Sequence, residues 1–397
     1  MSKPGICGGE MTFEETARLL EAEGLRTVTL GDKAAGGCLL IAPDLSARIM
    51  AVSMDGAKGE NFGFVKPEAI KNRANDRQFN AYGGALRWWA GPEGGQYGVA
   101  FPPGTKNFDL GSWYISEEYN GKAFAVAYPQ SGAGNSALMG AEFSVQNASG
   151  TRFHIGVASR LTVLPNSLDR GKARSPAGRM LSDGSVRHFG YRSEVTFENL
   201  SSEPMRGETG LVSIWMLAMY VAGSKTHVIA PFQRQGAGKV VTDTYFSPEG
   251  IASNRLIIKE RQGFLIFHAD AKHRSKIGLS RSRAANTLGS IDLSRNLLTI
   301  WRFPIRRTMP YVNSLWEYQK RPYAGDATNS YNDDGKFGNF YELECSSHAL
   351  ALKPGERFMF PLEIHHYRGT RDKLLQIADF LLQRKVSPFF LSSGASS

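Results

Sequence analysis

Residues 256–268, LIIKERQGFLIFH, place two short apolar runs on either side of a polar turn. The runs are Leu256–Lys259 and Phe264–His268, and Arg-Gln-Gly at 261–263 supplies the turn formers between them. So short a connection leaves no room for a crossover helix, and we expect the two runs to pair as antiparallel strands.

The same alternation of short runs and turns extends outward from this hairpin in both directions. Pro-Glu-Gly at 248–250 and Pro-Gly-Glu at 354–356 separate further runs. Strands joined by close turns, without helices between them, indicate antiparallel sheets and exclude a βαβ fold. The other expected strands are Arg26–Leu30, Cys38–Ile41, Arg48–Val52, Gly98–Phe101, Ala123–Ala127, Glu194–Glu198, Val228–Pro231, Leu297–Phe303, Tyr341–Cys345 and Arg357–His365.

Length and composition favour one large all-β unit. The chain has 397 residues, of which 43 are glycine and 42% are hydrophobic, so it can bury a sizeable core and make many turns. Sandwiches and barrels of this kind can exceed the usual domain size. Because no repeat and no Pro/Ser-rich linker divides the sequence, we predict a single domain over 25–388, preceded by a segment at 1–24.

Two helices are expected, one near each end of the chain. Thr12 and Glu15 form a capping-box pattern and Gly24 provides a stop, which predicts a short amphipathic helix before residue 24. Apolar residues at i, i+3, i+4 and i+7 spacing predict a C-terminal helix over 371–385. Residues 389–397 are expected to form a disordered tail.

The cysteines and the N-terminus bear on the compartment. Cys7, Cys38 and Cys345 cannot all pair within one chain and lack metal-ligand spacing, so free thiols in a reducing compartment are expected. The N-terminus has no apolar signal segment, and the apolar run 211–222 is shorter than the roughly 20 residues that cross a bilayer. We therefore expect a cytoplasmic protein without a membrane partner.

The formal net charge of +10 leaves two interpretations open. Basic residues cluster at 272–276, 281–283 and 306–307, without a long basic arm or a nucleic-acid-binding motif. These clusters indicate either a solvated face or attraction of an anionic sugar such as a uronate or a phosphosugar. No nucleic-acid partner is expected.

The segment 80–97, NAYGGALRWWAGPEGGQY, has the residue mixture that sugar binding needs. Aromatic faces cover the C–H face of a pyranose, Arg, Glu and Gln hydrogen-bond its hydroxyls, and glycines allow close backbone approach. The candidate ligand contacts are Asn80, Arg87, Trp88, Glu93 and Gln96. The alternative is a glycine-rich hairpin with buried tryptophans.

P-loop, GxSxG and HExxH motifs are absent from the sequence, and no cofactor is expected.

A second segment, 311–335, is long, polar and aromatic, which is typical of a binding loop carried by a rigid sheet. Its candidate contacts are Trp316, Asp326, Tyr331 and Asn332. Asp333 and Asp334 are interpreted as turn residues or as weak calcium ligands, since the EF-hand pattern is absent.

A third segment carries two carboxylates on one strand. Glu342 and Glu344 project to the same face, about 6–7 Å apart at their Cα atoms, and such a pair can raise one pKa. Downstream, Glu363, His365 and Tyr367 share a face of the next run. The alternative is a set of solvated charges at a sheet edge. A zinc site at His365 is the less specific interpretation, and no metal is expected.

These blocks resemble an uncharacterised bacterial family of galactose-mutarotase-like proteins, distantly similar to aldose 1-epimerases. The resemblance spans about residues 25–370 and rests on Gly83–Tyr97, Leu211–Met216, Arg274–Ser280, Tyr311–Ser314 with Trp316 and Glu317, Gly325 with Asp326, Asn329–Asp333, Tyr341–Glu344 and Lys353–Glu356. It implies an antiparallel β-supersandwich with short peripheral helices at both ends, and it adds Lys276 to the candidate ligand contacts.

Aldose epimerases use a carboxylate base and a histidine acid to open a pyranose ring. The resemblance points to Glu344 first and Glu342 second as the base. The epimerase histidine motifs do not match, so His365, with His268 and His188 as alternatives, is the candidate acid by residue type.

We therefore predict a carbohydrate-binding protein, specifically a sugar-active enzyme of mutarotase or epimerase type acting on an aldose or a uronate. Two alternatives stay open: a non-catalytic carbohydrate-binding protein, and a glycoside hydrolase or lyase that uses paired carboxylates.

Overall fold

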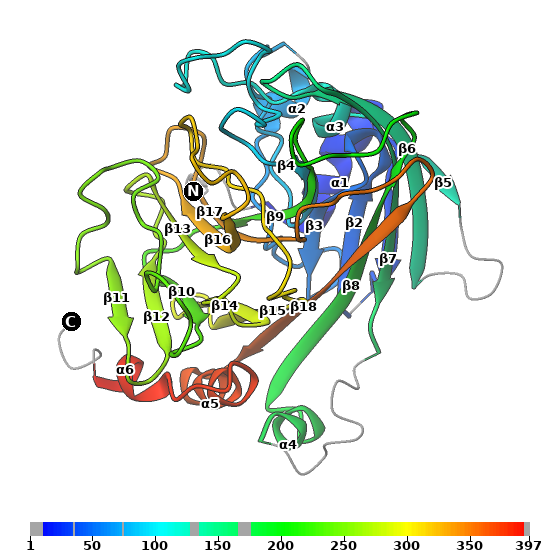
Figure 1. The fold of residues 1–397 in the computed structure, drawn as a ribbon. Helices are drawn as coiled ribbons and strands as arrows, with labels where there is room; N and C mark the ends of the chain where they lie inside the picture. Colours follow the sequence, from blue (N-terminus) through cyan, green and yellow to red (C-terminus); the bar gives the residue numbers. More distant parts are fainter. Residues whose placement is uncertain (1–10, 35, 74, 128–134, 166–175, 393–397) are drawn as a thin grey trace.

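The computed structural model describes residues 11–34, 36–73, 75–127, 135–165 and 176–392, and these form three antiparallel sheets (Figure 1). One sheet has ten strands, in the order β11-β12-β10-β14-β15-β18-β8-β7-β6-β5. A second has five, in the order β13-β16-β17-β9-β4, and a third joins β1, β2 and β3. Every pairing between neighbouring strands is antiparallel, as the short turns predict.

The strands are β1 (Val28–Gly31), β2 (Cys38–Ala42), β3 (Arg48–Ser53), β4 (Arg87–Gly91), β5 (Ala125–Ala127), β6 (Ser136–Gln146), β7 (Arg152–Val163), β8 (Val186–Asn199), β9 (Ser213–Val221), β10 (Thr226–Pro231), β11 (Leu256–Lys259), β12 (Phe264–His268), β13 (Ser275–Ser280), β14 (Thr287–Asp292), β15 (Leu297–Arg302), β16 (Asp326–Asn332), β17 (Phe340–Ser346) and β18 (Arg357–Gly369). The helices are α1 (Phe13–Ala22), η1 (Pro43–Leu45), α2 (Pro67–Lys71), α3 (Glu117–Asn120), α4 (Pro176–Ser182), α5 (Arg371–Leu381) and α6 (Ser387–Ser392).

The hairpin at 256–268 forms as predicted, with Leu256 opposite Phe267 and Lys259 opposite Phe264. The strand expected at Gly98–Phe101 is wrong. The backbone there bonds to loops instead of to a strand, because Val99 N–H donates to Pro92 O and Ala100 N–H to Glu93 O.

The segment 311–335 is not one long loop, which corrects the expectation. It contains β16, which lies between β13 and β17 in the five-stranded sheet. This strand lacks the apolar pattern by which strands are recognised in a sequence. Its Asn329 and Asn332 side chains donate hydrogen bonds to neighbouring backbone carbonyls instead of packing in a core. The apolar run 211–222 is likewise a central strand, β9.

The main core lies between the five-stranded and the ten-stranded sheets. Alternate residues of β17, namely Tyr341, Leu343 and Cys345, enter this core. Polar groups within it are paired across the sheets, since Ser290 of β14 lies 2.7 Å from the Tyr341 hydroxyl. The other face of the five-stranded sheet is thereby free to carry a site.

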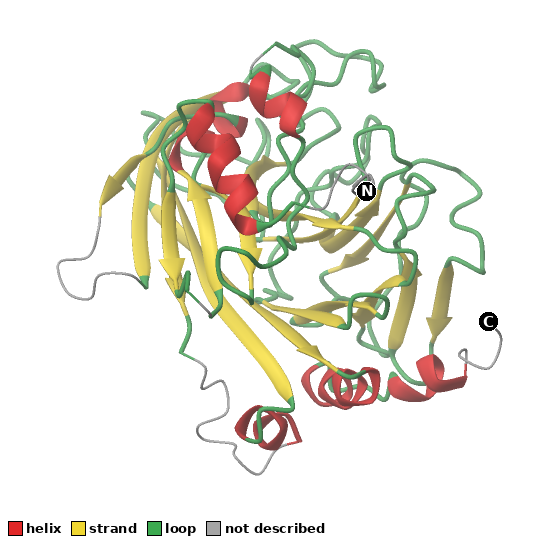
Figure 2. Ribbon diagram, turned by 180° about the vertical axis from the view of Figure 1, so that it is seen from behind, coloured by secondary structure: helices red, strands yellow, loops and turns green. Residues whose placement is uncertain are grey.

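The terminal helices pack against the outside of the sheets (Figure 2). Helix α1 has the predicted capping box between Thr12 and Glu15 and packs on the small β1–β3 sheet. Helix α5 packs on the half of the large sheet that contains β10, β14 and β15.

The C-terminal prediction needs two corrections. The helix expected over 371–385 ends at Leu381, and α6 begins at Ser387, where the Asp379 carboxylate accepts from Val386 N–H and Ser387 N–H. Residues 389–392 are therefore helical and not part of a tail, while 393–397 lie outside the described residues. Among the helices that the structure describes, none has both the length and the apolar character needed to cross a bilayer.

Candidate active site

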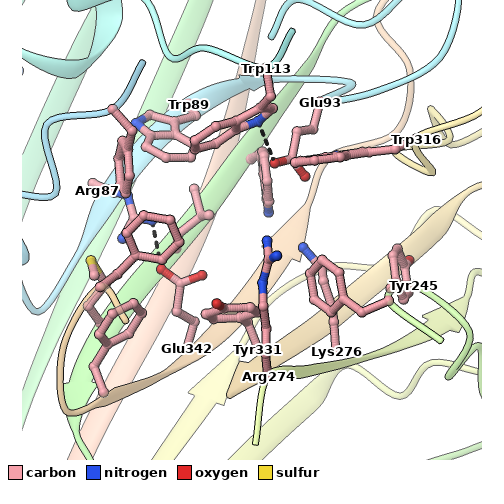
Figure 3. A pocket seen from close by; sticks show the side chains of 17 residues that line it. Arg87, Trp89, Glu93, Trp113, Tyr245, Arg274, Lys276, Trp316, Tyr331 and Glu342 are labelled. Atoms are coloured by element: carbon pink, nitrogen blue, oxygen red, sulfur yellow. Dashed lines mark hydrogen bonds and ion pairs between the residues drawn. The ribbon is translucent and has the colours of Figure 1, made fainter. Parts of the chain in front are cut away.

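A pocket lies over the outer face of the five-stranded sheet, with loops forming its roof (Figure 3). The space between its lining atoms is about 690 Å³, with its open mouth included. Its lining is aromatic with a few charged groups, and consists of Phe79, Arg87, Trp89, Glu93, Trp113, Trp215, Leu217, Met219, Tyr245, Phe246, Arg274, Lys276, Trp316, Tyr331, Phe337, Phe340 and Glu342.

Strand alternation decides which residues reach the pocket from β4. Arg87 and Trp89 point into it, and the Arg87 guanidinium stacks 4.4 Å from the Trp89 ring. Trp88 points the opposite way, between the sheets, where its ring packs against Phe143 and Phe197. The expected role of Trp88 is therefore corrected in favour of Trp89, which the two-residue period from Arg87 would have identified.

Glu342 lies on the pocket floor and is held by Arg87. Arg87 Nη2 donates to Glu342 Oε1 at 2.7 Å, and the two residues are only 4% and 7% exposed. Burial raises the pKa of Glu342 and the charge of Glu344 raises it further, while Arg87 partly opposes both effects. Nε and Nη1 of Arg87 are buried without a hydrogen-bond partner among the described residues.

Glu344 lies behind the pocket wall instead of in it. It is 0% exposed, and its Oε2 accepts from Lys276 Nζ at 3.0 Å and from Trp215 Nε1 at 3.0 Å. Lys276 does line the pocket. Burial favours the neutral amine, but the charges of Glu344 and Glu93 outweigh burial and raise the pKa of Lys276, so it stays an ammonium.

Glu93 descends from the roof, above Glu342 in the view of Figure 3. Its Oε1 accepts from Trp113 Nε1 at 3.1 Å, and the Trp113 ring stacks on Trp316 with centroids 5.8 Å apart. Burial raises the pKa of Glu93, and the nearby Lys276 only partly opposes this. The pocket therefore contains two carboxyls with raised pKa values.

Asp326 does not line the pocket but holds a residue that does. Tyr245 donates its hydroxyl to Asp326 Oδ2 at 2.7 Å and accepts from Asn329 Nδ2 at 2.8 Å. Burial raises the pKa of Asp326 to about 6. A side chain at Gly278 would approach Asp326 Oδ2 to 2.1 Å, so this close packing requires glycine.

Three further candidates hold loops and do not face the cavity. Gln96 exchanges hydrogen bonds with the backbone of Gln319, which ties the two predicted binding segments together. Asn80 donates to Asp76 O and to Glu117 Oε1. Asn332 accepts from Ala271 N–H and donates to His273 O, which fixes the turn before Arg274.

The histidine predicted as the acid is not at the pocket. His365 lies on β18 of the ten-stranded sheet, and its Nδ1 is 3.2 Å from Nε2 of His188. Burial lowers the pKa of His365. His268, the other alternative, contacts Ser224 O and also does not line the pocket. No histidine is among the described residues that form the lining.

Sequence reasoning missed most of the aromatic lining. Trp215 points inward from β9, and Trp113, Tyr245 and Phe246 come from loops far apart in the chain. Trp316 and Tyr331, which the sequence had indicated as contacts, do line the pocket. Arg274 was within a noted basic cluster but was not singled out. Trp215 carried a usable signal, as Trp89 did on β4, because it alternates with Leu217 and Met219 on β9.

The pocket can stack a sugar ring on its aromatic side chains and can transfer protons through its carboxyls. In the part of the chain that the structure describes, no three His, Cys, Asp or Glu side chains are grouped to hold a metal ion.

The sequence of residues 11–388 matches the model of DUF6786, a family of unknown function. The chain belongs to this family. A search of curated proteins finds no match.

Solved structures share the architecture at low identity. A proposed aldose 1-epimerase from Escherichia coli K12 is 12% identical with a TM-score of 0.50, covering 86% of this chain and 99% of its own. A galactose mutarotase-like protein from Lactobacillus casei is 10% identical with a TM-score of 0.45, covering 86% and 100%. The architecture shared with the Escherichia coli protein and the antiparallel sheets show that this DUF6786 member has the galactose mutarotase-like supersandwich fold, as the resemblance implied.

Proposed function

We propose that the pocket binds a sugar ring and that Glu342 accepts the proton of its anomeric hydroxyl, in a reaction of aldose 1-epimerase type. The observation that carries this proposal is the position of Glu342, a carboxyl with a raised pKa on the floor of an aromatic pocket. The fold shared with the Escherichia coli protein supports a sugar ligand.

The contacts of the two carboxyls support different roles for them. Glu342 has a cationic partner in direct contact, the Arg87 guanidinium, which favours its ionised form and suits a base. Glu93 has no ion-pair partner among the described residues, and burial raises its pKa although the Trp113 indole N–H donates to it, so its protonated form is favoured and suits an acid. Glu93 takes the place that the sequence analysis gave to a histidine.

The reaction then balances in protons. Glu342 takes the proton from O1 as the C1–O5 bond breaks, and Glu93 gives its proton to O5, which leaves the open-chain aldehyde. Rotation about C1–C2 and ring closure return each proton to its donor with C1 inverted. Glu344 acts indirectly, because its charge keeps Lys276 protonated and raises the pKa of Glu342.

The test is anomer exchange followed by NMR for a sugar first found by thermal-shift screening. Glu342→Gln keeps the shape of the side chain but removes the proton acceptor, so the exchange rate should fall about 10²- to 10⁴-fold with little loss of affinity. Glu317→Gln is the matched control, because Glu317 is exposed beside Trp316 and does not line the pocket. Equal rates in wild type and Glu342→Gln would reject Glu342 as the base.

A second candidate is a non-catalytic sugar-binding protein. It is favoured by the Arg87–Glu342 ion pair, which already satisfies one oxygen of the carboxylate, as in a fixed binding contact. This candidate predicts sugar binding by the wild type with an exchange rate equal to that of buffer. Release of a reducing end from a glycoside would instead favour hydrolysis by the Glu93 and Glu342 pair.

A further inference from the structure

Arg274 is a cation of the pocket wall without a carboxylate partner among the described residues. It directly precedes β13, two residues before Lys276, so both side chains reach the same side of the strand. Its guanidinium lies 4.2 Å from the centroid of the Phe246 ring, and its Nε is buried without a hydrogen-bond partner.

The other lining charges are already matched. Arg87 pairs with Glu342, and Lys276 pairs with Glu344 behind the wall. The remaining carboxyl, Glu93, has a raised pKa because it is buried. The pocket therefore presents one positive charge in excess whenever Glu93 carries its proton.

The position of Arg274 is built into the fold. Asn332 clamps the preceding turn through Ala271 N–H and His273 O, and Ser275 Oγ donates to the same His273 carbonyl at 2.8 Å. Phe246 covers one face of the guanidinium, which leaves its N–H edges for a ligand. Arg274 also lines an adjoining depression, so it lies at the border of the sugar pocket and not at its floor.

We infer that the natural ligand is an acidic sugar and that Arg274 binds its anionic group, a carboxylate or a phosphate, while the ring rests among the tryptophans. This inference rests on the proposed sugar-binding function and adds the substrate class. A guanidinium suits either anion, because its N–H groups match two oxygens at once. Partial removal from water strengthens such a contact.

The test compares matched acidic and neutral sugars by calorimetric titration: glucuronate and glucose 6-phosphate against glucose, and galacturonate against galactose. The wild type should bind at least one acidic member about 10- to 100-fold more tightly than its neutral partner, the usual strength of a charge-assisted hydrogen bond. The uronate and phosphate members separate the two anion sources. The preference should weaken as salt is added.

Arg274→Gln should reduce the ratio of acidic-sugar to neutral-sugar affinity to less than about threefold. Lys272→Gln is the matched control, because it removes the same charge from an exposed residue of the same turn that does not line the pocket. Arg274→Lys, which keeps the charge, should retain part of the preference, and thermal unfolding checks that each variant folds.

Equal wild-type affinity for acidic and neutral partners, or an acidic preference that survives in Arg274→Gln, would overturn the inference and leave the proposed function standing. If no sugar of either kind binds the wild type, the proposed function and the inference both fail.

Discussion

Single residues on one strand can have opposite environments. Glu342 and Glu344 share a face of β17, yet one lines the pocket and the other is sealed behind Lys276 and Trp215. On β18, His365 faces His188, whereas its neighbour His366 lies in the core beside Phe62 and Tyr220. Neither histidine is among the described residues that line the pocket.

His366 should make the protein acid-sensitive. It is 0% exposed, and burial lowers its pKa to about 3 from the ordinary 6.5. Between these two pH values His366 is protonated in the unfolded chain but neutral in the folded protein. The free energy of unfolding therefore falls as the pH drops through this window. In His366→Gln the loss of unfolding free energy between pH 7 and pH 5 should be smaller by about 1–2 kcal/mol.

Urea unfolding at the two pH values measures this difference. His273→Gln is the control, because His273 is exposed and has no ion-pair partner among the described residues, and this variant should lose about as much stability as the wild type. If the pH dependence of stability is unchanged in His366→Gln, a group other than His366 causes the loss of stability at low pH.

At the scale of elements, the roof of the pocket depends on two loops joined by Gln96. Its side chain accepts from Gln319 N–H and donates to Gln319 O, across 223 residues of sequence. Ser314 Oγ adds a bond from Glu93 N–H. These contacts place Trp316 opposite Trp113, although neither Gln96 nor Gln319 touches the cavity.

Gln96→Ala should therefore weaken sugar binding without removing proton transfer. Loss of two hydrogen bonds, each worth about 1 kcal/mol, should raise the sugar Kd by up to about 30-fold, whereas exchange at saturating sugar stays within about threefold. Tryptophan fluorescence should shift as Trp316 moves. Gln376→Ala on the exposed face of α5 is the control, and a drop in saturated rate matching Glu342→Gln would contradict a positioning role.

At the scale of the molecule, each of the two large sheets pairs strands that are far apart in the sequence. β4, at 87–91, pairs with β9, and β8 pairs along its length with β18, at 357–369. Any division of the chain into halves would separate strands of one sheet. This arrangement supports the prediction of a single domain over 25–388.

Limited proteolysis and thermal unfolding test that prediction. We expect one cooperative unfolding transition and one protease-resistant body, because separated halves would expose the core between the sheets. Two stable fragments of similar size, or two separate transitions, would contradict it.

The sequence by itself determined those structural features that depend on residues close together in the chain. The capping box of α1, the hairpin at 256–268 and the shared face of Glu342 and Glu344 each depend on residues a few positions apart. β16 escaped detection because its polar side chains are satisfied by partners that only the folded sheet supplies.

Only the tertiary structure decided which candidates form the site. A two-residue period states that side chains share a face, but not whether that face meets water, a core or a pocket. Pairing of β17 with β9 and β16 placed Glu344 under Lys276 and left Glu342 open to the cavity, and pairing of β18 with β8 carried His365 to the other sheet. These pairings join residues more than a hundred positions apart, except that of β16 with β17, so no local pattern encodes them.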